Sequence, residues 1–380
     1  MSGNPTFHSA TIPDSRLLQG LLGLRGLAAI SVVLYHLYLI TGLALPEGFG
    51  FIGRDFGYGA HLFFVLSAFS LMHSTEHTVS HPTWVRDYLV KRFFRIAPLF
   101  YLMLCLMLAK YAIQAAMSGV AFPVSADRII LNIFFVFGFF SNPDYSLVML
   151  GWTIGVEMIF YVLFPVILVT VKTSRQALIL LVLLVMAGYA ARSLAHMEYL
   201  QANPTPRWDG SYFWFASNLY FFGAGIYAYR VAHEAKDAGV VFRVLIPVIA
   251  AGLIGVLLFT NIDQPLQNPG RIDLVVWAAG FAALCIWQSR HPSRWIASKF
   301  LEYTGERSYS VYLLHGPIIL YLKDYIRNGY AMLQGFVGTY AFFLCAAVVL
   351  LLVMTAAEIT YRLVEVPGIR LGRRIIGKAG

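Results

Sequence analysis

The stretch RGLAAISVVLYHLYLI, residues 25–40, decides the fold class. It is apolar and of helix length, but it starts on an arginine and contains a histidine. Similar apolar runs recur along the whole 380-residue chain, which is 59% hydrophobic and only 12% charged. Soluble domains carry about 25% charged residues, and about 20 apolar residues cross a bilayer as one helix. The sequence therefore predicts an all-α, polytopic bundle of transmembrane helices.

Apolar runs and the breakers between them predict about ten spans. They cover residues 21–41, 58–73, 96–117, 151–171, 177–194, 212–230, 243–260, 271–288, 307–322 and 336–361. A further run, 129–140, has only 12 residues, so we expect it to be interfacial or re-entrant. The polar first 20 residues do not have the pattern of a cleavable signal peptide.

The basic residues predict the orientation of the bundle. With a cytoplasmic N-terminus, 19 of the 28 Lys and Arg residues fall in cytoplasmic segments and 7 fall outside. This bias follows the positive-inside rule, so both termini are predicted to be cytoplasmic. The net charge of +9 then reflects basic loops, and no nucleic-acid partner is expected. The predicted division is a cytoplasmic segment (1–20), a membrane domain (21–362) and a basic cytoplasmic tail (363–380).

Metal and disulfide chemistry are not predicted. The three cysteines lie in separate apolar runs without metal-ligand spacing, so they indicate small buried residues.

Arg25 and His36 form a polar pair on the first span. Eleven residues turn a helix about 20° past three full turns, so both side chains share one face about 16 Å apart. Ionisable groups inside a membrane helix are costly and indicate a functional site. Alternatively, Arg25 alone reaches the inner headgroups, and His36 alone bonds to a neighbouring helix. The shared face favours a functional pair.

Glu157 is the expected partner of His36. Thr153, Glu157 and Tyr161 are spaced i, i+4 and i+8 and form a polar stripe. Glu157 and His36 are each five or six residues from the outer end of their spans. We therefore expect Glu157 to orient His36 as a general base. The alternative is a structural pair that locks two helices together.

Other polar residues suggest binding roles. Lys91, Arg92 and Arg95 open the third span, and guanidinium groups suit phosphate oxygens, although juxtamembrane arginines also serve topology or anionic lipid. Ser67 lies in the second span, where helix packing is the simpler explanation. His315, beside Tyr312 in the ninth span, is expected to line a pocket.

Six motifs occur along the chain in a fixed order. They are Arg25-x10-His36, FFVLSAF (63–69), KRFFRIAPLFY (91–101), WTIGVEMIFYVLFP (152–165), YSVYLLH (309–315) and YRLVEVP (361–367). In this order they resemble the acyltransferase-3 family of integral-membrane O-acyltransferases, from about Leu18 to Arg374. Ala68 replaces the usual glycine of the second motif, and His61 stands where the family commonly has an acidic residue.

The resemblance implies transfer of an acyl group, often acetyl, from cytoplasmic acyl-CoA to a hydroxyl of a glycan, lipid-linked sugar or secondary metabolite. It also implies a bacterial inner-membrane location. His36 would be the catalytic histidine, and Glu157 the motif carboxylate. Donor contacts are expected from Arg25, Lys91, Arg92, Arg95, Ser67 and Tyr101. Substrate contacts are expected from Trp152, Tyr161, Tyr312 and His315, with no metal.

The main alternative is a proton-coupled transporter, because buried His, Glu and Arg also suit a carrier. Against it, the chain shows no pair of interrupted helices at matching places in two halves. A lipid-linked-sugar enzyme without an acyl donor would be expected to carry acidic metal-binding clusters in a loop, and the sequence shows none.

Overall fold

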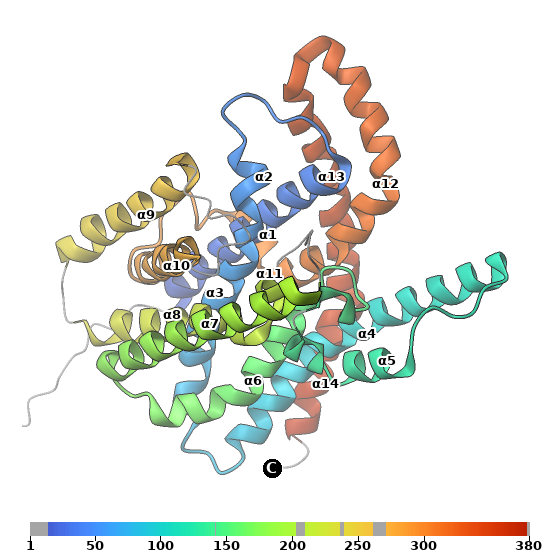
Figure 1. Ribbon diagram of the computed structural model, residues 1–380. Helices are drawn as coiled ribbons and strands as arrows, with labels where there is room; N and C mark the ends of the chain where they lie inside the picture. The colour runs from blue at the N-terminus through green and yellow to red at the C-terminus, as the bar shows by residue number, and fades with distance from the viewer. Residues whose placement is uncertain (1–13, 141, 203–209, 236–238, 261–270, 378–380) are drawn as a thin grey trace, which may run out of the picture.

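The computed structural model describes residues 14–140, 142–202, 210–235, 239–260 and 271–377, which form a helical bundle without strands (Figure 1). The long helices are α1 (Asp14–Thr41), α3 (Gly59–Thr75), α4 (Trp84–Ser118), α6 (Trp152–Thr170), α7 (Ser174–Ala202), α8 (Phe215–Glu234), α9 (Ile246–Thr260), α10 (Ile272–Arg290), α12 (Ser308–Val337) and α13 (Ala341–Thr360). The shorter helices are α2 (Phe51–Asp55), α5 (Ala126–Ile133), α11 (Lys299–Glu306) and α14 (Val366–Gly377).

Each predicted span overlaps one long helix, which confirms the all-α class. By length and composition, eight stretches of the described chain are able to cross a membrane. Helices α12 and α13 fall in one such stretch, and α8 is not among the eight. The count of ten and the orientation therefore remain predictions. The short run 129–140 divides between α5 and the 3-10 helix η3 (Val136–Phe139), and neither is long enough to span.

The two predicted terminal segments are only partly described. The first 13 residues of the predicted N-terminal segment and residues 378–380 of the predicted tail lie outside the described residues. Most of the rest of the tail forms helix α14, which packs against α4.

Helix α1 lies inside the bundle, packed against α3, α10, α11 and α12. Two glycines of α1 lie close to the backbone of α11 and of the loop before it. A Cβ added to Gly23 would lie 1.9 Å from the Ile296 carbonyl oxygen, and one added to Gly26 would lie 2.2 Å from the Leu301 oxygen. Small residues let membrane helices approach this closely. The polar face of α1 is consequently surrounded by protein.

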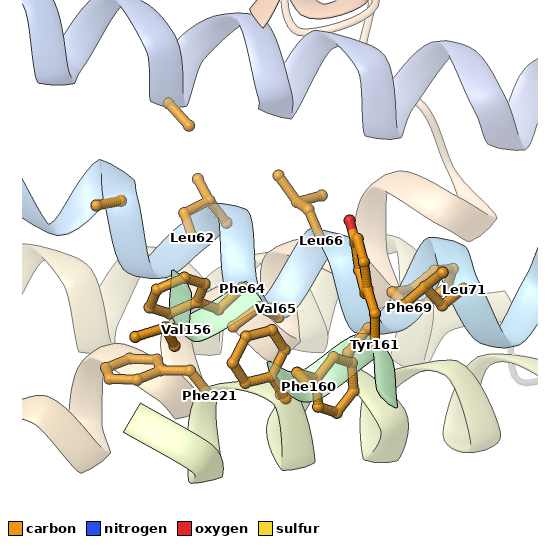
Figure 2. Packing of buried hydrophobic residues seen from close by; sticks show 14 of the residues in the cluster. Leu62, Phe64, Val65, Leu66, Phe69, Leu71, Val156, Phe160, Tyr161 and Phe221 are labelled. Atoms are coloured by element: carbon orange, nitrogen blue, oxygen red, sulfur yellow. The ribbon is translucent and has the colours of Figure 1, made fainter. Parts of the chain in front are cut away.

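Helix α3 is held by an aromatic core that it shares with α6 and α8. Phe160 and Phe222 stack with ring centroids 4.0 Å apart, and Phe64 stacks on Phe222 at 4.8 Å. Figure 2 shows Phe64, Phe160 and Phe221 gathered on one side of α3, with the Tyr161 hydroxyl directed away from them. This packing presents Tyr161 to the polar side of α3.

The first turn of α6 is covered by the preceding segment. Gly138 of η3 lies against Gly155, and a Cβ on Gly138 would lie 2.7 Å from the Gly155 carbonyl carbon. Phe135 and Leu150 both have positive φ, at 58° and 61°, which marks two turns of the backbone. Because this segment folds over the beginning of α6, that helix starts within the bundle.

The substitution Gly26→Ala tests the close packing of α1. The added methyl group meets the rigid backbone of α11, so we expect a loss of about 1–3 kcal/mol and a lower melting temperature in detergent. Gly252→Ala is the matched control, because a Cβ there meets nothing within 4 Å. An unchanged melting temperature for Gly26→Ala would contradict this packing.

Candidate active site

Polar residues from five helices line one open cleft. The cleft, including its mouth and the solvent space there, holds about 630 Å³ of empty space. The residues come from α1, α3, α4, α6 and α12, so the cleft depends on the whole bundle. Its polar lining consists of Arg25, Ser67, Ser70, Arg92, Arg95, Thr153, Glu157, Tyr161, Ser308, Tyr309 and Tyr312.

Glu157 is fixed by two hydroxyl groups. Ser67 Oγ donates to Glu157 Oε1 at 2.6 Å, and the Tyr161 hydroxyl donates to the same oxygen at 2.5 Å. Tyr161 lies one turn further along α6, as the predicted polar stripe requires, whereas Ser67 belongs to α3. Within the described chain, Glu157 Oε2 has no hydrogen-bond donor. The carboxyl group is therefore oriented, with one oxygen available to a ligand.

Within the described part of the chain, the three arginines of the cleft pair with no carboxylate. Arg25 Nε donates to Ser308 Oγ at 3.4 Å, and its guanidinium lies over Phe63. Arg92 Nη2 donates to Ser74 Oγ at 3.1 Å, while its Nε is buried without any partner. Over the described residues, no ion pair within 4.0 Å involves Arg25, Arg92 or Arg95. Guanidinium groups in this state can bind phosphate oxygens.

A pair of histidines lies beside the cleft. His36 of α1 and His315 of α12 approach with 3.2 Å between His36 Nδ1 and His315 Nε2. Each Nδ1 also contacts the carbonyl oxygen four residues earlier, at 2.9 Å to Val32 and 3.1 Å to Val311. The ring of Tyr312, which lines the cleft, packs on His315 with centroids 5.6 Å apart. Tyr312 thus connects the histidine pair to the cleft.

The predicted contact between Glu157 and His36 is wrong. Glu157 lines the cleft together with Arg25, whereas His36 lies three turns further along α1 and contacts His315. The prediction assumed that α6 begins at the membrane surface. Because the segment before it folds back over its first turn, Glu157 lies deeper in the bundle than its position in the sequence indicates.

The cleft collects six of the predicted binding residues, namely Arg25, Ser67, Arg92, Arg95, Tyr161 and Tyr312. Three others lie elsewhere. Lys91 is exposed, Tyr101 donates to the Ile133 carbonyl oxygen at 2.6 Å, and Trp152 packs on Tyr212 and Phe213.

Two residues of the cleft were missed by the sequence reasoning, Ser308 and Tyr309. The available signal was helical spacing, because Tyr309 and Tyr312 are i, i+3 neighbours on one face. Over the described residues, no group of three or more His, Cys, Asp or Glu side chains is placed to hold a metal ion.

The sequence of the chain matches a known protein family. A profile described as an acyltransferase domain matches residues 18–357, nearly the whole chain. This chain belongs to the acyltransferase-3 family. Membership confirms the family resemblance, and five of the six motifs lie within the matched residues. Together with the apolar helices, it makes the chain an integral membrane protein.

Curated relatives of this chain include O-acetyltransferase OatA from Staphylococcus aureus strain NCTC 8325 / PS 47 and strain MRSA252. Each is 24% identical over 375 residues, which is 93% of this chain and 57% of the relative. The chain thus spans a little over half the length of the curated relatives it matches. No solved structure matches it significantly.

The substitution Tyr161→Phe tests how Glu157 is held. Loss of one hydroxyl donor to a buried acceptor is expected to cost about 1–2 kcal/mol, measured as a lower melting temperature without ligand. Tyr189→Phe is the matched control, because Tyr189 is exposed on the surface of α7. If both variants melt like the unaltered protein, the bond between Tyr161 and Glu157 contributes nothing to stability.

Proposed function

We propose that this chain is a membrane O-acyltransferase that moves an acyl group, with acetyl as the proposed group, from cytoplasmic acyl-CoA to a hydroxyl group. The observation that carries the proposal is the cleft with three arginines lacking carboxylate partners, connected through Tyr312 to the pair His36–His315. Family membership and relatives named as O-acetyltransferases support the same reaction.

The donor is proposed to bind by its phosphates at Arg92 and Arg95. These residues lie three positions apart on α4, so they face the same side of that helix. The buried Nε of Arg92 has no partner, and a phosphate oxygen would supply one. In the predicted orientation this end of the cleft faces the cytoplasm, where acyl-CoA is available. The pantetheine arm would then extend past Arg25 toward His36, about 16 Å along α1.

His36 is proposed to act as the general base. It removes the proton of the acceptor hydroxyl, whose oxygen attacks the thioester carbonyl carbon. The carbon–sulfur bond breaks, CoA leaves as the thiolate, and the new ester carries the acyl group. Glu157 takes part from the cleft, where it orders Ser67 and Tyr161 and offsets part of the arginine charge around the donor.

The acceptor is proposed to be a hydroxyl of a glycan, a lipid-linked sugar or a secondary metabolite, reached from the extracytoplasmic side of a bacterial inner membrane. The predicted topology supports this side, because it places His36 in the outer half of α1. The alternative of a proton-coupled transporter has less support, because the family match concerns an acyltransferase domain.

Donor binding can be measured through thermal stability. A ligand at 100 times its Kd stabilises a protein by about 2.7 kcal/mol, so saturating acetyl-CoA should raise the melting temperature. Arg92→Ala should reduce this shift, whereas Arg294→Ala, which removes an exposed arginine outside the cleft, should not. Acetyl-pantetheine, which lacks the nucleotide phosphates, should bind both variants equally. A full acetyl-CoA shift in Arg92→Ala would contradict the phosphate site.

Chemistry can be separated from binding by a substitution of His36. In proteoliposomes supplied with acetyl-CoA and a panel of sugars, chito-oligosaccharides and alkyl glucosides, acceptor-dependent CoA release reports transfer. His36→Ala should lower this rate by about 100-fold or more and keep the acetyl-CoA shift in melting temperature. His77→Ala, which changes an exposed histidine, serves as the control. Unchanged transfer in His36→Ala would remove His36 from the mechanism.

A further inference from the structure

The contact between the two histidines determines where their protons lie. A backbone carbonyl only accepts hydrogen bonds, and each histidine directs Nδ1 at the carbonyl of the residue four positions earlier. Each Nδ1 must therefore carry a hydrogen. A bare Nδ1 on His36 would instead place two lone pairs 2.9 Å apart.

The third contact agrees with this assignment. With its hydrogen on Nδ1, a neutral His315 has a lone pair on Nε2, and this nitrogen lies 3.2 Å from His36 Nδ1. The Nδ1–H of His36 is then shared between the Val32 carbonyl oxygen and His315 Nε2. All three contacts are satisfied by two neutral rings, and Nε2 of His36 keeps its lone pair.

We infer that His315 is a positioning residue that holds His36 in the tautomer whose Nε2 acts as the base. This inference rests on the proposed function. When His36 takes a proton on Nε2, its Nδ1–H still donates to His315, which stabilises the cation that has formed. In a Ser-His-Asp triad, a carboxylate orients the histidine and stabilises its cation. In the described chain, no Asp or Glu forms a hydrogen bond with either ring.

The surroundings of the pair support a fixed geometry. His315 is fully buried, and its ring lies between His36 and Tyr312, with centroids 5.0 Å and 5.6 Å away. The ring of Tyr35 meets His36 edge-on at 4.9 Å. These ring contacts restrict rotation of both histidines, which keeps the two nitrogens near their 3.2 Å separation.

The test compares two substitutions at the same position. His315→Gln retains an amide oxygen that can accept from His36 Nδ1–H, and His315→Leu removes the acceptor. In the CoA-release assay, His315→Leu should lower kcat by about 10- to 100-fold, with KM for acetyl-CoA within about twofold. His315→Gln should recover most of kcat. His61→Leu, which changes a buried histidine outside the pair, should retain kcat.

A second measurement does not depend on activity. Nitrogen-15 NMR of histidine-labelled protein in proteoliposomes, assigned with His36→Gln, should show His36 protonated on Nδ1 and bare on Nε2. In His315→Leu this preference should weaken. If His315→Leu does not fold, His315→Gln and the wild-type spectrum decide the matter.

The outcomes separate the inference from the function on which it rests. Wild-type protein that transfers to no acceptor, but shows the Nδ1–H tautomer, would contradict the proposed function and leave the positioning role standing. Active wild type with inactive His36→Ala and a fully active His315→Leu would overturn the inference. A wild-type His36 protonated on Nε2 would overturn it as well.

Discussion

The permanent charge of Arg25 is the constraint around which this bundle is arranged. An arginine does not deprotonate in proteins, and inside a membrane helix it costs a few kcal/mol or more when it faces lipid. Helix α1 avoids this cost because close glycine contacts surround it with α11 and its other neighbours. Once Arg25 is directed inward to Ser308, the shared helix face also directs His36 inward.

The same constraint explains why the partner of His36 is another histidine. A carboxylate beside His36 would place a charge inside the bundle, and buried ion pairs recover their desolvation cost only with excellent geometry. Two neutral rings satisfy their nitrogens with each other and with backbone carbonyls. Three arginines and Glu157 line the open cleft instead.

Much of this could be predicted from the sequence, because hydropathy and helical spacing are local properties. The eleven-residue spacing placed Arg25 and His36 on one face, and the three-residue spacing placed Arg92 and Arg95 together. Tyr101, which was expected to contact the donor, is about 240° around α4 from Arg95, a spacing that the prediction did not take into account. How deep Glu157 lies in the bundle was not predictable, because this depends on a preceding segment that folds over the start of α6. The contact between His36 and His315 requires α1 to pack against α12, and the sequence of either helix alone does not predict that packing.

The central claim is that donor binding and chemistry occupy two ends of one path along α1. The most direct measurement is an electron cryomicroscopy structure of the protein in nanodiscs with bound CoA. The account predicts CoA phosphates at Arg92 and Arg95, the pantetheine arm passing Arg25, and the thiol sulfur beside His36 Nε2. CoA phosphates bound away from these arginines, or a thiol directed away from His36, would contradict it.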